Sequence, residues 1–176
     1  MTTPTESSHS AEDWFKIGLD RGRAGDNQGA IEAYNNAVEL DPTHFKALMN
    51  LGIRYGKLLM NVKALDSFKK AIDLKPDDAM AHYSLALTAN LCGLTDDSIK
   101  HYKEACRIKP AFAEAYSNLA TVYYQFKQGR EAIENLLIAQ KLFDEQGNRQ
   151  MVATAQSLLQ DLYKEFHLSR EDFPDA

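Results

Sequence analysis

Three phrases share one pattern and each ends in proline: NAVELDP (36–42), KAIDLKP (70–76) and EACRIKP (104–110). Successive prolines are 34 residues apart, since 76 minus 42 and 110 minus 76 are equal. Each phrase is typical of the end of an amphipathic helix, and proline cannot continue a helix because it lacks the amide hydrogen and clashes with the preceding turn. The chain is therefore predicted to repeat a helical unit.

The residues between two such prolines carry two apolar stripes with helical spacing. In residues 45–78 the stripes are Leu48, Leu51, Gly52 and Tyr55, followed by Ala64, Phe68 and Ala71. The small side chains of Gly52, Ala64 and Ala71 allow the two helices to approach closely. Each unit is thus predicted to be a helix hairpin.

These stripes resemble the tetratricopeptide repeat, whose pattern runs W-x2-L-G-x2-Y, then A-x3-F, then P. The resemblance implies an all-α fold, a right-handed α-solenoid of four 34-residue helix hairpins with a C-terminal capping helix. The predicted segments are a disordered N-terminal arm (1–10), four repeats (11–44, 45–78, 79–112 and 113–146), a capping helix (147–168) and an acidic tail (169–176). The tail is predicted to be loose.

The capping helix is predicted from one apolar face, because a stack of repeats leaves its last hydrophobic face open. That face consists of Met151, Val152, Ala155, Leu158, Leu159, Leu162, Tyr163 and Phe166. The fourth repeat has Asp144 in place of the closing proline, so its end is less clearly marked than the others.

The composition indicates which classes of partner and which cellular location to expect. The formal net charge is −5 with both signs interspersed, which argues against nucleic acid, because phosphate binding needs a basic stripe. The two cysteines, Cys92 and Cys106, cannot staple a small secreted scaffold, so a reducing, cytoplasmic location is predicted. Residues 1–10 hold no apolar run, and no stretch approaches the length of a membrane span, so we expect no direct membrane insertion.

The sequence offers no reaction, and the chain is predicted not to be an enzyme. No two histidines have the spacing of a metal site on one helix, and the glycines do not form a phosphate-binding loop, so we expect no metal and no cofactor. A site built from His82, His101, Cys92 and Cys106 within one hairpin is the alternative. The favoured interpretation is two buried thiols and two interface histidines.

The predicted binding site is the second face of each first helix, opposite the repeat signature. In a right-handed superhelix, as the resemblance implies, this face lines a concave groove. The predicted partner-binding residues are Phe15, Leu19, Lys46, Met49, Asn50, Ile53, Lys57, Met80, Tyr83, Leu87, Leu91, Asn118 and Tyr124. For any one of these residues the alternative is cover by a neighbouring first helix, and for Asn50 and Asn118 it is a solvated amide.

The expected partner is a protein or peptide segment with apolar side chains, because a helix that is apolar on both faces expects cover on both. A basic margin at the N-terminal end, formed by Lys16, Arg23, Lys46 and Lys57, favours some acidic residues in the ligand. The function predicted from the sequence is a protein–protein interaction adaptor. The alternative is a self-assembling structural module, a homo-oligomer in which another copy or the chain's own C-terminal segment fills the groove or the end of the stack.

Overall fold

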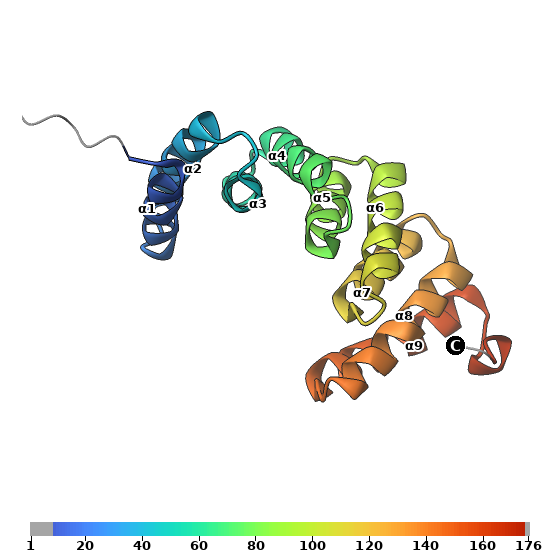
Figure 1. Ribbon diagram of the computed structural model, residues 1–176. Coiled ribbons are helices and arrows are strands. Elements are labelled where there is room, and N and C mark those ends of the chain that lie inside the picture. The colour runs from blue at the N-terminus through green and yellow to red at the C-terminus, as the bar shows by residue number, and fades with distance from the viewer. Residues whose placement is uncertain (1–8, 175–176) are drawn as a thin grey trace, which may run out of the picture. The chain divides into compact units, whose positions relative to one another are not determined.

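The computed structural model describes residues 9–174, and this range consists of helices joined by turns (Figure 1). The helices are α1 (Ala11–Arg23), α2 (Asn27–Leu40), α3 (Phe45–Lys57), α4 (Asn61–Leu74), α5 (Ala79–Leu91), α6 (Thr95–Ile108), α7 (Ala113–Gln125), α8 (Gly129–Glu145), α9 (Arg149–Phe166) and the short 3-10 helix η1 (Arg170–Asp172). Consecutive helices pack in pairs. The predicted all-α fold of helix pairs is confirmed.

Local signals in the sequence set where the helices begin and end. Ser10 starts α1 with a capping box, in which the Ser10 hydroxyl accepts from the Asp13 amide at 3.2 Å. Asp78 caps α5 in a related way, its carboxylate accepting from the Ala81 amide at 2.8 Å. These oxygens satisfy amides that have no partner inside the helix. At the other end, α2 stops two residues before Pro42, as the repeated phrase predicts.

The first compact unit takes in the described residues up to Pro76 and contains α1 to α4, each packed on the next. Its close helix contacts occur at glycine. Gly18 of α1 faces the fully buried ring of Tyr34 in α2, and Gly52 of α3 faces the ring of Phe68 in α4. A β-carbon at either glycine would overlap the facing ring, so the signature glycine allows each hairpin to close.

The second compact unit comprises residues 77–176 and contains α5 to α9. Here α5 packs on α6, α6 on α7, α7 on α8 and α8 on α9. The last helix buries Ala155, Leu159 and Leu162, while Phe166 lies against Gly129 at the start of α8. The C-terminal helix thus covers the apolar side that the last pair would otherwise expose.

The prediction of a loose C-terminal tail is wrong for residues 169–174. Ser169 and Asp172 form a capping box around η1, and the following Phe173 is only 3% exposed. The Phe173 ring lies 6.2 Å from the ring of Tyr163, and the guanidinium of Arg130 stands 5.1 Å above it. Burial of one aromatic side chain outweighs the entropy of a short polar segment.

The predicted disordered N-terminal arm falls mostly outside the described residues, at 1–8. Within the described range, His9 lies with its ring 5.1 Å from that of Trp14, and Ser10 is the cap of α1. No helix among the described residues is long and apolar enough to cross a membrane.

Candidate protein-binding surfaces

The face of α3 in the first unit presents three of the predicted site residues to solvent. Lys46, Ile53 and Lys57 are exposed, and Ile53 is 42% exposed although it is apolar. Asn50 is partly buried, and its side-chain amide donates to the Lys46 carbonyl at 2.8 Å. One of the two hydrogens of this amide is therefore used within the helix.

Two predicted groove residues of the first unit, Phe15 and Met49, are buried, so for them the structure favours the alternative of cover by neighbouring helices. Phe15 is only 7% exposed, and its ring packs 4.8 Å from His44 and 5.9 Å from Tyr34. Met49 is 8% exposed, and Leu19 is partly covered against the same core as Phe15. The reason is that a helix in a stack of hairpins is covered from more than one side, so a residue beside the signature stripe also packs.

The face of α5 in the second unit carries apolar side chains in the open. Met80 is 50% exposed, Leu87 41% and Leu91 63%. Side chains of this kind gathered on one short helix are typical of a surface that receives a partner.

Two further predicted residues, Tyr83 and Asn118, contact each other. The amide nitrogen of Asn118 in α7 donates to the Tyr83 hydroxyl at 2.9 Å. The Tyr83 ring packs 4.9 Å from Phe112 and 5.8 Å from Tyr102, and burial raises the pKa of its hydroxyl. This hydrogen bond ties α7 to α5, so Asn118 acts within the second unit as a structural contact.

A recess between α7 and α9 lies beside Tyr124, the last of the predicted residues. It has a volume of about 320 Å³ and is lined by Ser117, Ala120, Thr121, Tyr124, Leu136, Leu158, Asp161, Leu162 and Glu165. Leu158 is 46% exposed and Tyr124 38%, so both line the recess from its edge. The volume suits one or two apolar side chains of a ligand.

The wall of the recess is held by a small polar network. Glu165 accepts from the Tyr124 hydroxyl at 2.9 Å and from the Lys127 ammonium at 2.7 Å. The hydrogen bond from Lys127 is the largest cause of a lowered pKa for Glu165, followed by the one from Tyr124. Asp161 makes no ion pair among residues 9–174, so it supplies a free carboxylate beside the apolar floor. From the sequence, Leu158 is expected on the capping face, and the C-terminal helix is considered as a segment that could fill the groove, not as a wall of a binding site.

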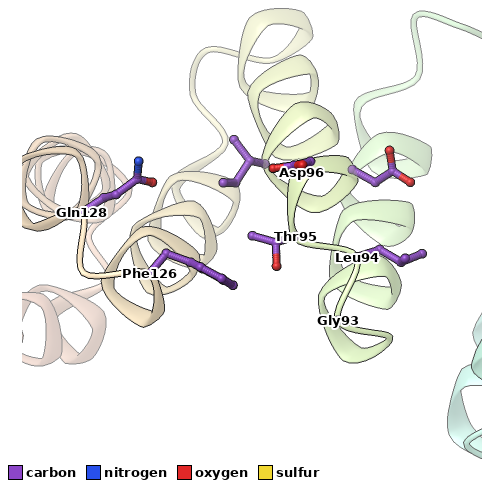
Figure 2. Close-up of a pocket in the computed structure, with 8 residues that line it drawn as sticks. Gly93, Leu94, Thr95, Asp96, Phe126 and Gln128 are labelled. Carbon is purple, nitrogen blue, oxygen red and sulfur yellow. The ribbon is translucent and has the colours of Figure 1, made fainter.

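A larger depression of about 760 Å³ lies away from this face, where two interhelix turns meet (Figure 2). Figure 2 shows Phe126 and Gln128 of the α7–α8 turn on one side, with Leu94 of the α5–α6 turn and Thr95 and Asp96 at the start of α6 on the other. Its polar lining and the Asp96 carboxylate make it a poorer receptor for apolar side chains than the recess.

The alternative chemical site is only partly assembled. His82 and His101 do meet, with their Nδ1 atoms 2.8 Å apart, so one imidazole donates to the other. Burial raises the pKa of the Cys106 thiol to about 12, which leaves it unreactive at neutral pH. Across residues 9–174, no three His, Cys, Asp or Glu side chains cluster closely enough to hold a metal ion.

Comparison with known proteins supports the repeat. A family model described as TPR repeat matches residues 23–58, which include α2 and α3, and residues 92–126, which include α6 and α7. No curated protein matches the chain by sequence.

Solved structures resemble the chain over most of its length. The crystal structure of MamA protein has a TM-score of 0.72 at 21% identity, covering 94% of this chain and 96% of that one. MamA 41-end from Desulfovibrio magneticus RS-1 has a TM-score of 0.74 at 22% identity, covering 78% of this chain and 77% of that one. At these identities the similarity shows the fold alone.

Proposed function

We propose that this chain, two segments of which match a family model described as TPR repeat, is a protein–protein interaction adaptor that holds an apolar segment of another protein on its first-helix faces. The observation that carries this proposal is the recess between α7 and α9, with exposed Leu158 and Tyr124 at its edge. A cavity of about 320 Å³ floored by leucine leaves apolar surface in water unless a ligand side chain fills it.

The ligand has apolar anchors of leucine or methionine size, matched to the recess and to the exposed side chains of α5. Lys46 and Lys57 on α3 favour acidic residues in a segment bound to the first unit. Asp161 favours a basic residue beside the anchor that enters the recess. The ligand is therefore an apolar segment of mixed charge, and the proposal assigns it no reaction and no cofactor.

The test is selection of binders from a displayed peptide library, followed by calorimetry with the selected peptide and three variants. Leu158→Asp places a charge at the edge of the recess, and Leu87→Asp does the same on α5. Leu40→Asp is the matched control, because Leu40 is 58% exposed on a second helix, outside the first-helix faces. We expect binding to fall by about tenfold or more in at least one of the first two variants and to be unchanged in the control.

The helical circular dichroism of all three variants is expected to match that of the unmodified chain. A selected peptide that binds all three variants equally well would contradict the proposal. Unfolding of Leu158→Asp or Leu87→Asp would show that the residue belongs to the core, and binding by the remaining folded variant would then decide the question.

The alternative, self-assembly, uses the same exposed residues but differs in one measurement. Light scattering after size exclusion separates a concentration-independent monomer from a stable homo-oligomer. In the second unit, the Phe166 ring packs against Gly129 at the start of α8, and the Phe173 ring packs against Tyr163 of α9. This packing favours the adaptor over a groove filled by the chain's own C-terminal segment, because both rings are already packed within the second unit. Cys92 and Cys106 are both free thiols, consistent with the cytoplasmic setting that we propose.

A further inference from the structure

The turn between α3 and α4 differs from the equivalent turns of the chain. In each of the four interhelix turns spaced by one repeat, one residue has a positive φ: Gly25 (84°), Leu59 (58°), Gly93 (72°) and Lys127 (58°). Glycine adopts this conformation without strain, whereas a branched apolar side chain adopts it rarely. A large apolar residue held in such a position is a reason to look for a function there.

The side chains around Leu59 are apolar and stand in the solvent. Leu58 is 38% exposed, Leu59 81%, Met60 36% and Val62 77%. We call these four residues the apolar tip. At the position of Val62 the other turns carry Gln28, Asp96 and Arg130, all polar, so the apolar tip is not a requirement of the repeat.

The segment that carries the apolar tip is also basic, although the chain as a whole has a net charge of −5. No Asp or Glu occurs from Pro42 to Leu65, while Lys46, Arg54, Lys57 and Lys63 all fall in this stretch. A run of this length without a carboxylate gives the α3–α4 turn a local positive potential.

Two of these cations flank the apolar tip and are free to bind an anion. Lys57 and Lys63 are exposed, and neither forms an ion pair within residues 9–174. Lys63 stands 5.6 Å from the ring centroid of Tyr55, a cation–π contact that a stronger anionic ligand would replace.

The α1–α2 turn, next to it in the first unit, carries carboxylates that offset its cations, unlike the α3–α4 turn. Arg54 donates to the Asn27 side chain at 3.1 Å, which places the α1–α2 turn beside the end of α3. There Arg21 pairs with Glu32 at 3.7 Å and Arg23 pairs with Asp20 at 3.1 Å. Asp26 is the remaining carboxylate of this turn, and it accepts from the Gly29 amide at 2.8 Å.

We propose that the apolar tip, flanked by Lys57 and Lys63, docks this protein onto an anionic lipid surface. Leu59 and Val62 enter the boundary between headgroups and acyl chains, while the two ammonium groups bind lipid phosphates. Insertion is shallow, because a bilayer span takes about 20 residues. The sequence predicted no direct membrane insertion because it holds no apolar stretch long enough to span a bilayer. That criterion detects membrane-crossing helices and does not apply to a short apolar turn.

A lipid surface suits the apolar tip better than a protein groove does. The most exposed side chains, Leu59 and Val62, protrude at 81% and 77% exposure, so they do not form a pocket that a partner's side chain could enter. A bilayer boundary accepts a protruding side chain without a shaped pocket, and its negative surface potential attracts adjacent lysines. This inference goes beyond the proposed adaptor function and does not depend on it.

The test is flotation of the full chain with phosphatidylcholine vesicles, with and without phosphatidylglycerol. We expect binding only to the anionic vesicles, weakened by salt. Lys57→Gln with Lys63→Gln is expected to weaken binding by roughly 30-fold, from about one kcal/mol for each lysine. Leu59→Gly with Val62→Gln is expected to weaken it by about tenfold or more. Glycine suits the φ of residue 59, so this variant is expected to fold.

Phe126→Gln is the matched control, because Phe126 is a 52% exposed apolar residue in the α7–α8 turn of the second unit. The control is expected to bind anionic vesicles like the unmodified chain. The proposal is overturned if the unmodified chain does not float with anionic vesicles, since the apolar tip would then be left for a protein partner. It is equally overturned if the Leu59→Gly, Val62→Gln variant floats as well as the control.

Discussion

Gly52 and Gly56 lie one turn apart on the same helix, α3, and the same substitution is expected to have opposite effects at the two positions. A β-carbon at Gly52 would lie 2.5 Å from Cε1 and 2.6 Å from Cζ of Phe68, whose side chain is only 3% exposed. A β-carbon at Gly56 would meet nothing within 4 Å. The pair thus isolates the close approach of α3 and α4.

The magnitudes follow from two opposing effects. Overpacking a buried site costs up to about 3 kcal/mol, and the Phe68 ring is buried at 3% exposure. Alanine in place of glycine inside a helix stabilises by about 1 kcal/mol. We therefore expect Gly52→Ala to lower the free energy of unfolding by about 2 kcal/mol, and Gly56→Ala to raise it by about 1 kcal/mol.

The assay is urea unfolding followed by far-ultraviolet circular dichroism. Both variants lose one glycine from the unfolded chain, so the effect on unfolded-state entropy cancels in their difference. That difference is about 3 kcal/mol, or roughly a hundredfold in the unfolding equilibrium constant. Equal stability of the two variants, or a more stable Gly52→Ala, would refute the close contact between Gly52 and Phe68.

Two further predictions concern the second unit. Phe173→Ala is expected to lower the free energy of unfolding by about 3 kcal/mol, because the ring is buried. Phe126→Ala, at an exposed ring, is expected to change it by less than about 0.5 kcal/mol. Urea unfolding compares the two variants, and equal changes would mean that the tail does not pack. Burial raises the pKa of Cys106 from its usual 9.0 to about 12, so the unfolded chain loses this proton first as the pH rises. Stability conferred by the neutral thiol is therefore complete below about pH 9 and is expected to fall by about 1.4 kcal/mol per pH unit from there towards about pH 12. Unfolding curves across this range should be less steep in pH for Cys106→Ala, and an unchanged slope would contradict the assignment.

Several features of the fold could be predicted from sequence because they depend on neighbours along the chain. A proline two residues past Leu40 ends α2 whatever lies elsewhere, and Gly52 with Phe68 forms a helix contact inside one repeat. The tail could not be predicted in this way. Phe173 follows a short polar segment with no periodicity. Its burial is apparent only from the structure, in which its ring packs beside Tyr163 and under the Arg130 guanidinium.

For the candidate site too, the sequence predicted which face of a helix a residue lies on but not whether the residue is buried. Helical spacing places Phe15, Met49 and Ile53 on one kind of face, yet the first two are buried and only Ile53 is exposed at 42%. Spacing gives the direction of a side chain from its own helix axis. Whether a side chain is buried depends on the helices packed against that face. The spacing of residues in the sequence does not give the distance or the angle of those helices.

The repeat, its helices and the residue types available for binding follow from the order of residues along the chain, because helix formation and termination are local. Which of those residues meet solvent depends on tertiary packing, which also brings Leu158 of α9 beside Tyr124 of α7 to form the recess. The structure also shows that Leu59, in the α3–α4 turn, and Val62, at the start of α4, are exposed to solvent. Burial is a property of packed neighbours, and these neighbours are distant in the chain.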